Sequence, residues 1–558
     1  MRTFQSALLV VVVGLAACKE PLDVTNVNNP DRDRVLAKPL DVEVLIGQLY
    51  QNFINATIGG SNNGLQPQLL TSGMESYSGN ANFQMGPRGA IPRGSPHVPN
   101  GRGNPGEEGN LRDFQRLSVT ARTAADALKR LSAPGFTIAT PARDARALAF
   151  GQFVLGLSLG HLALVYDSAA IVRPTDSLPS GILTLDDIRT LLPLAGYSTV
   201  MGAGIAYLDS AIATVNANST GFPLPATWIN GNPLTSAQFI QVVRSYRAKL
   251  RAGVARTPAA RAAVDWNAVI ADATFGITAN LNVRMDAAAG WDVVWVIQHY
   301  LFQSWTQMWQ FMVGFAADQA SFDAWLGTAV ANRTPFLVVT PDRRFPVGAT
   351  RAAQQAASGC TSTGCAPPTG NLYFRNRDGA QDIAGISLAF SFYDFYRFQS
   401  FFDAQRIGNY PVMAKAEIDL LAAEGYIRTG QFAQATALID ITRVGRGILP
   451  SVAGIANLTT PVPGGASCVP RIPVGPNFTS SACGNLFEAL KWEKRMETAY
   501  IGYGSWYFDS RGWGDLPEGT ALHWPVPWQE LDSRFETLYD MPATSGTLPG
   551  AARGTYGL

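Results

Sequence analysis

Apolar residues recur at three- and four-residue steps along most of the patterned segments of this chain, which predicts amphipathic helices. In 113–131 the repeat runs through Phe114, Leu117, Ala121 and Leu128. The same spacing predicts helices over 201–217, 237–252, 257 onward past Trp266, 411–429 and 431–443. Only Thr429 and Gly430 separate the last two. A helix, a tight break and a second helix is the pattern of helical hairpin repeats.

The segment from Thr140 to about residue 166 gives a further helix signal. Thr140 supplies a hydroxyl cap, and Pro141 suits the first helical position. The residues that follow are apolar on most faces, yet they include Gln152, His161 and several glycines. This composition predicts a buried core helix rather than a membrane span.

Three long segments read mainly as loops: about 78–110, 280–400 and 450–484. The first is rich in glycine and proline and excludes a helix. We expect ordered loops with a few short strands there, and loops of this length in a compact domain are usually functional. The helix pairs are expected in about 111–275 and 410–445, so the predicted fold class is mostly α.

The N-terminus predicts the cellular address. Arg2 provides a positive start, and residues 7–13 form an apolar run too short to span a bilayer. Leu15-Ala16-Ala17-Cys18 resembles a bacterial lipoprotein signal, in which the cysteine thiol is lipidated. We therefore expect a signal peptide over 1–17, a lipidated tether over 18–37 and a single body over 38–558. The alternative is an ordinary secretory signal followed by a chance cysteine.

Composition limits both the class of protein and the kind of partner. Of the 558 residues, 47% are hydrophobic and 15% are charged, which describes a large globular chain rather than a disordered one. Lys and Arg number 43 against 42 Asp and Glu, so net charge gives no reason to expect a nucleic-acid partner.

Four cysteines remain after Cys18: Cys360, Cys365, Cys468 and Cys483. No two of them form a CxxC pair and the histidines are scattered, so a zinc site is not expected. In an exported chain the four allow three pairings. We favour Cys360–Cys365 and Cys468–Cys483, because each pair lies within one loop; free thiols are the alternative.

Catalytic signatures are absent from the sequence. It contains no H-E-x-x-H, no P-loop and no G-x-S-x-G. Gly101, Gly103 and Gly106 spell G-x-G-x-x-G, but they lie in a proline-rich loop with no strand before and no helix after. We expect no enzyme activity and no cofactor, with a lipid-anchored hydrolase as the opposing hypothesis.

Three C-terminal stretches resemble a known family. They are Tyr410-Pro411-Val412 continuing through Glu417 to Glu424, Trp492 to Glu497 continuing to Trp506-Tyr507-Phe508-Asp509 and Arg511, and Trp524-Pro525-Val526-Pro527. In order and spacing they are similar to motifs of the SusD/RagB family of outer-membrane nutrient-binding lipoproteins. Ala414, Lys415, Ile501 and Gly504 depart from the usual pattern, as in a divergent member.

The resemblance implies a fold and partners. The expected body has tetratricopeptide-like helix pairs, an irregular ligand-binding half and a C-terminal family segment over about 485–558. It would sit as a lid on a TonB-dependent, SusC-like transporter in the outer membrane. Glu493, Arg495 and Glu497 are expected to hold loops by meeting separate partners rather than to catalyse.

Aromatic residues give the candidate binding site. Trp291, Trp295 and Trp305 lie in a tryptophan-rich segment together with several glutamines. Flat rings stack on sugars or apolar ligands, and amides supply hydrogen bonds. The alternative is that any one of these rings belongs to the core. The early loop with Tyr77, Phe83 and Arg88 is the second candidate, because the family tends to build its site partly from N-terminal loops.

Four functions stay open at this point. The first is a surface lipoprotein that binds glycan or oligosaccharide nutrients for a transporter. The second is a binder of peptides or other nutrients. The third is a helical-repeat scaffold that only docks proteins, and the fourth is the hydrolase. A concave aromatic site would favour the first, and converging titratable groups would favour the last.

Overall fold

The computed structural model describes most of the chain after residue 31. The described residues are 32–59, 64–78, 84–103, 107–176, 184–218, 221–293, 306–361, 364–382, 388–543 and 548–558. The predicted signal peptide, Cys18, Phe83, Trp295 and Trp305 lie outside them.

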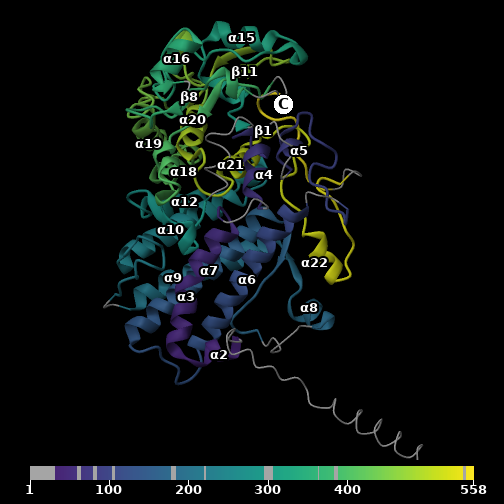
Figure 1. Ribbon diagram of the computed structural model, residues 1–558, viewed down its shortest axis with the longest axis vertical. Helices are drawn as coiled ribbons and strands as arrows, with labels where there is room; N and C mark the ends of the chain where they lie inside the picture. The colour runs from purple at the N-terminus through teal and green to yellow at the C-terminus, as the bar shows by residue number, and fades with distance from the viewer. Residues whose placement is uncertain are drawn as a thin grey trace, which may run out of the picture.

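A stack of helices forms the lower half of the molecule in Figure 1, and each helix packs against the next one in the stack. In packing order these helices are α3 (Pro39–Ala56), α6 (Glu107–Leu131), α7 (Pro141–Val165), α9 (Tyr197–Ala217), α10 (Ser236–Gly253) and α12 (Trp266–Thr274).

Helix α7 lies at the centre of this stack, in contact with α3, α6, α9 and α10. The side chain of Thr140 accepts a hydrogen bond from the Arg143 N–H, so the predicted cap begins the helix as expected. Its most apolar stretch is 89% buried, which confirms a core helix. A Cβ on Gly156 would meet the Gly204 carbonyl oxygen at 2.8 Å, so glycine permits the close approach of α7 and α9.

The upper half consists of loops, helices and most of the paired strands, whereas residues 168–170 and 194–196 form a strand pair against the helix stack. Among the described residues, each strand forms a two-stranded antiparallel sheet with one partner. The pairs are β1 (Tyr77–Ser78) with β5 (Thr306–Gln307), β2 (Ser168–Ala170) with β3 (Leu194–Gly196), β4 (Leu281–Met285) with β10 (Gly408–Met413), β6 (Cys360–Thr361) with β7 (Gly364–Cys365), β8 (Phe374–Asn376) with β9 (Tyr393–Phe395), and β11 (Arg471–Val474) with β12 (Ser480–Cys483).

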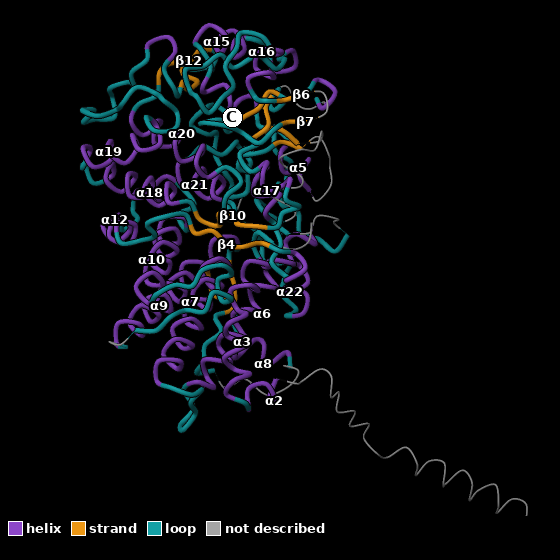
Figure 2. Tube along the Cα trace, turned by 60° about the vertical axis from the view of Figure 1, so that its left-hand side comes forward, coloured by secondary structure: helices purple, strands orange, loops and turns teal. Residues whose placement is uncertain are grey.

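Two features join the halves. The β4–β10 pair lies at mid-height between the helix stack and the loop-rich region (Figure 2). Helix α18 (Lys415–Arg428) then packs on α12 and carries α19 (Phe432–Arg443) and α20 (Leu486–Thr498) beside it. Helix α21 (Ser505–Trp513) follows α20 and contacts α4 (Gln66–Ser72), α10 and α11 (Pro258–Ala262). The prediction of a mostly α fold with few short strands is confirmed.

Several expected boundaries differ from the structure. The helix expected from 411 begins at Lys415, because Gly408–Met413 pairs with β4, from which it is distant in the sequence. The single helix expected after Thr257 is two, α11 and α12, with Asp265 capping the second. The glycine-rich segment 78–110 does contain a short helix, α5 (Met85–Gly89), and α6 already begins at Glu107.

The four body cysteines form two disulfides. Cys360 bonds Cys365 across the β6–β7 pair, and Cys468 bonds Cys483 at the end of the β11–β12 pair. Both bridges therefore fasten local loops in the upper half, and neither links distant parts of the chain.

Candidate functional site

The structure brings together the two segments in which the sequence placed candidate binding residues. Strand β1 pairs with β5, with Tyr77 opposite Gln307 and Ser78 opposite Thr306. The Trp309 indole N–H donates to the Ser76 carbonyl oxygen at 3.0 Å. Residues 79–83 follow Ser78 and residues 294–305 precede Thr306, so both segments attach to the same end of one strand pair.

Tyr77 and Arg88 are buried beside this junction. Tyr77 is 7% exposed, and its ring meets Trp309 edge-to-face at 5.6 Å between centroids. Arg88 is 1% exposed; its guanidinium donates to the Gln68 side chain at 3.2 Å and to the His97 carbonyl oxygen. Burial lowers the pKa of Arg88 to about 9. Both side chains thus contact the protein's own interior.

Trp291 belongs to the core of the helical half. Its side chain is 6% exposed and lies against the Tyr50 ring at 6.4 Å between centroids. Its backbone exchanges hydrogen bonds of 3.0 and 2.8 Å with Asp286. This position leaves the ring little surface for a ligand, as the core alternative for a single tryptophan anticipates.

A buried carboxyl group lies just before β1. Glu75 is 2% exposed, and its carboxylate oxygen accepts from the Tyr500 backbone N–H at 2.6 Å. Burial raises the pKa of Glu75 to about 8, although the Tyr500 hydrogen bond acts in the opposite direction. Tyr500 itself has a left-handed backbone, φ 57°, and its carbonyl oxygen accepts from the Tyr410 hydroxyl.

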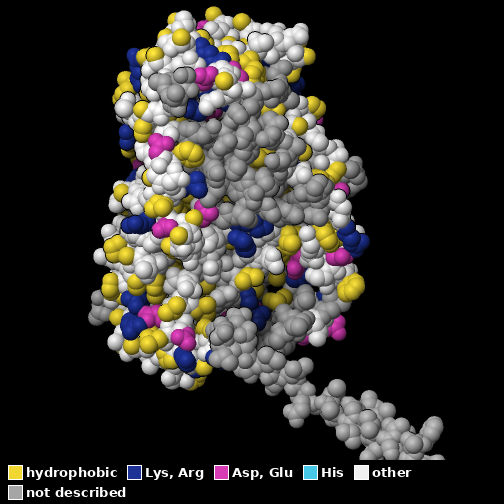
Figure 3. Space-filling view, viewed as in Figure 1, with side chains coloured by type: hydrophobic (Ala, Val, Ile, Leu, Met, Phe, Trp, Pro, Cys, Tyr) yellow, Lys and Arg dark blue, Asp and Glu magenta, His cyan; other side chains and the backbone are white. Residues whose placement is uncertain are grey.

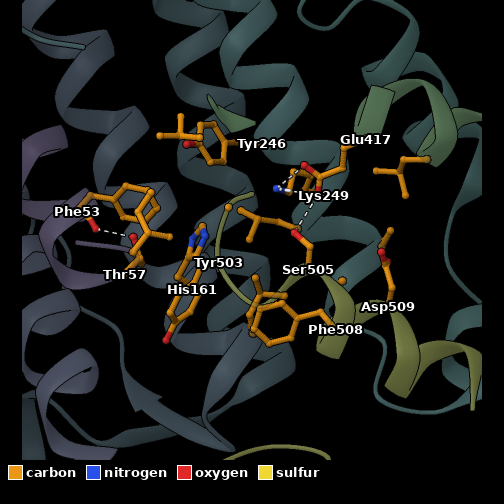
Figure 4. Close-up of a pocket in the computed structure, with 18 of the residues that line it drawn as sticks. Phe53, Thr57, His161, Tyr246, Lys249, Glu417, Tyr503, Ser505, Phe508 and Asp509 are labelled. Carbon is orange, nitrogen blue, oxygen red and sulfur yellow. Dashed lines mark hydrogen bonds and ion pairs between the residues drawn. The ribbon is translucent and has the colours of Figure 1, made fainter. Parts of the chain in front are cut away.

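A second candidate is the interior cavity where the helix stack meets α18 and α21 (Figure 4). Lys249 pairs with Glu417 at 2.9 Å, and the Ser505 hydroxyl donates to the same carboxylate at 3.1 Å. The His161 Nδ1 donates to the Leu157 carbonyl oxygen at 2.9 Å, and burial lowers the pKa of His161 to about 4. His161 is therefore neutral near pH 7.

The chemistry of this cavity is limited by its pairing and its size. The carboxylate bonded to Ser505 is already neutralised by Lys249, so it is a poor general base for that hydroxyl. The free volume is about 50 Å³, which accommodates a few water molecules, whereas small-molecule sites measure roughly 300–1,000 Å³. No cluster of three or more metal-binding side chains occurs among the described residues.

Comparison with solved structures decides the fold. A SusD superfamily protein from Bacteroides thetaiotaomicron superimposes over 89% of this chain and 96% of its own, at 11% identity and a TM-score of 0.50. The chain has a SusD-like fold. A SusD-like protein from Bacteroides fragilis is also similar, over 87% and 88% of the two chains, at 13% identity and a TM-score of 0.49. No family model and no curated protein matches the sequence.

The C-terminal motifs that resemble the SusD/RagB family form buried ion pairs and hydrogen bonds in this SusD-like fold. Glu493 accepts from Arg344 at 2.8 Å, Arg495 donates to Asp515 at 2.6 Å, and Glu497 accepts from Tyr373 at 2.9 Å. Arg495 thus has a partner of its own, but Glu497 also lies 3.8 Å from the Arg344 guanidinium that Glu493 binds. The expectation of three separate partners is therefore wrong for the two glutamates, which share Arg344.

The partners of these motifs could not be read from the sequence. Arg344, Asp342 and Asp515 lie in segments without periodic pattern, and Asp342 also accepts from the Trp492 indole N–H at 3.1 Å. Charged residues in a loop region are usually solvated, so only burial distinguishes these. Together they tie the loop-rich half to the C-terminal helices.

Proposed function

We propose that the protein is a surface lipoprotein that binds glycan or oligosaccharide nutrients and delivers them to a TonB-dependent, SusC-like transporter. The observation that carries the proposal is the SusD-like fold, which extends over 89% of the chain. The Cys18 box at the N-terminus supports a lipid anchor on the outer membrane.

The interior cavity, with a free volume of about 50 Å³, is too small for an oligosaccharide, so the proposal places the ligand elsewhere. Basic and acidic side chains are interspersed over the described part of the face in Figure 3, in keeping with a neutral ligand rather than a nucleic acid. No cofactor enters the proposal.

The proposed ligand contacts are at the β1–β5 junction. Trp295, Trp305 and Phe83 belong to the two segments that attach to one end of this strand pair. We assign them the stacking role. Tyr77 and Arg88 are buried beside the junction, so in this proposal they support the strand pair rather than contact the ligand, and Trp291 supports the helical core.

The test is a binding screen with the soluble form that begins at residue 25. An array of oligosaccharides and a matched set of short peptides separates the glycan hypothesis from the peptide hypothesis. We expect saturable oligosaccharide binding in the micromolar to millimolar range, about −8 to −4 kcal/mol. Binding of peptides alone would favour the second hypothesis, and binding of neither would favour the docking scaffold.

The transporter part has its own test. Mild detergent extraction of the tagged full chain, followed by mass spectrometry, should recover a TonB-dependent β-barrel protein in stoichiometric amount. A Cys18→Ala chain provides the control, since loss of the anchor should lower this recovery. Absence of any such barrel from the wild-type extract would contradict the assignment.

A further inference from the structure

A cleft lies between α6 and α22 (Trp528–Ser533), distant from the β1–β5 junction in Figure 1. The two helices lie side by side, and Ala170 of β2, Val172 just after it and Leu192 just before β3 complete the lining. The free volume is about 480 Å³. This size falls in the range of small-molecule sites, unlike the interior cavity of Figure 4.

Much of the cleft lining is apolar. The apolar lining comprises Leu111, Phe114 and Val119 of α6, together with Val172 and Leu192. Val119 is 59% exposed, so a large aliphatic side chain faces open space there. An apolar ligand would gain by covering this surface.

The charges in the cleft are already neutralised. Arg122 pairs with Asp126 at 3.0 Å along α6, and Arg534 pairs with Glu530 at 2.7 Å along α22. Arg534 also donates to the Leu192 carbonyl oxygen at 2.8 Å. An ionic ligand would have to displace one of these partners, so the cleft favours an uncharged one.

Helix α22 contributes an unsatisfied hydrogen-bonding group. Gln529 lines the cleft, and its side-chain oxygen is shielded from solvent with no hydrogen-bond partner. The side chain would gain a hydrogen bond by turning toward a donor in the cleft.

The segment that follows α22 is held in place by α8 (Leu185–Leu191). The Arg189 guanidinium donates to the Arg534 carbonyl oxygen at 2.6 Å, and Phe535, the next residue, is 76% exposed.

We propose that the α6–α22 cleft is a second binding site, for a neutral, mostly apolar small molecule that carries one hydrogen-bond donor. The site is separate from the proposed nutrient site and does not depend on it. Its ligand fills the cleft against Val119 and Phe114 and donates to Gln529.

The probe is N-phenyl-1-naphthylamine, an uncharged fluorescent molecule with two aromatic groups and one N–H. Titration into the soluble form should give saturable fluorescence enhancement with one site per chain and a micromolar Kd. Val119→Asp places a charge in the apolar lining, and Ser118→Trp fills the cleft. Each should weaken binding at least tenfold.

Val330→Asp is the matched control, because Val330 is also exposed, at 51%, but does not line the cleft. It should leave the Kd unchanged. Val119 is exposed, so its variant should keep the wild-type Tm even where Ser118→Trp disturbs the fold. Non-saturable enhancement, or an unchanged Kd in Val119→Asp, overturns the proposal. Oligosaccharide binding should be equal in Val119→Asp and wild type, which separates this site from the nutrient site.

Discussion

Glu75 is buried, and among the described residues it pairs with no Lys or Arg. Its pKa is raised to about 8 from an ordinary 4.5, so the folded protein holds a proton that the unfolded chain has already lost at neutral pH. The stabilisation is complete below pH 4.5 and is lost as the pH rises through 8. Glu75 lies two residues before β1, and its pKa is raised by burial. Looser packing at the β1–β5 junction would therefore lower this pKa.

We predict that Glu75→Gln flattens the pH dependence of stability. Glutamine keeps an acceptor for the Tyr500 N–H but cannot ionise. One pKa unit corresponds to about 1.4 kcal/mol, so wild type should lose a few kcal/mol relative to the variant between pH 5 and 8. Urea unfolding at a series of pH values measures this. Parallel curves for the two proteins would mean that Glu75 ionises freely in the folded state.

Trp291→Ala should destabilise the fold rather than act on binding alone. The ring is 6% exposed and packs on Tyr50, and truncating a buried tryptophan costs roughly 3–5 kcal/mol. Chemical denaturation of the variant gives the value. A loss under about 1 kcal/mol would show that Trp291 is not part of the core.

For individual aromatic residues, the sequence could not distinguish a ring that stacks on a ligand from a ring in the core. The tryptophan-rich segment was recognisable, but a stacking ring and a core ring have the same residue type and the same spacing. Trp291 and Trp309 are buried because Tyr50 and Ser76, distant in sequence, pack against them. Such contacts leave no local signal in the chain.

Among the elements, helices with local signals were predictable and strand pairs were not. α7 follows its cap at Thr140, and α10 has the full capping box of Thr235 and Gln238. The β4–β10 pair instead joins segments separated by more than one hundred residues. Short strands of this kind depend on the partner, so the sequence favoured a helix from 411.

The contact between α11, α18 and α21 depends on a buried ion pair. Arg261 donates to Glu424 at 2.6 Å and to Asp509 at 3.1 Å, and the Arg261 and Glu424 side chains are 0% exposed. Burial alone would raise the pKa of Glu424, but Arg261 holds it at about 2. Its contribution is present above pH 4.5 and is lost as the pH falls toward 2.

We therefore predict that Glu424→Gln costs about 3 kcal/mol at pH 7, the lower end of the range for a broken buried pair, because Arg261 loses its two-point contact with Glu424 and keeps the Asp509 carboxylate at 3.1 Å. Replacing both residues, as in Arg261→Met with Glu424→Leu, should recover part of this loss. The control is Asp532→Asn, which breaks the exposed Arg102–Asp532 pair and should leave stability unchanged. Equal stability of Glu424→Gln and wild type would show that the pair contributes nothing.

For the whole molecule, the C-terminal motifs predicted the fold correctly although overall identity to a solved SusD superfamily structure is 11%. The motif residues Trp492, Glu493 and Arg495 are buried and hydrogen-bonded in the interior, so they hold the scaffold together. The proposed ligand contacts could not be predicted in the same way, because loop residues carry no regular spacing from which their neighbours follow.

The anchor is tested on the full chain. We predict that Cys18→Ala blocks lipidation and moves the protein from the detergent phase to the aqueous phase in a phase-partition assay, because one residue supplies the acylated thiol. Ser6→Ala, within the same N-terminal stretch, is the control and should partition like wild type. Detergent-phase partitioning of Cys18→Ala would contradict the lipoprotein assignment.

Nutrient binding by this fold is decided by titrating the best oligosaccharide from the screen into Trp295→Ala, Trp305→Ala and wild type, with Tm measured in parallel. A stacking ring should lose several-fold to a hundredfold in affinity while the Tm stays within a few degrees, since good aromatic contacts contribute roughly 0.5–1.5 kcal/mol beyond buried area. Unchanged affinity in both variants, with Tm preserved, would contradict a site at the β1–β5 junction. A lowered Tm in both would assign these rings to the core as well.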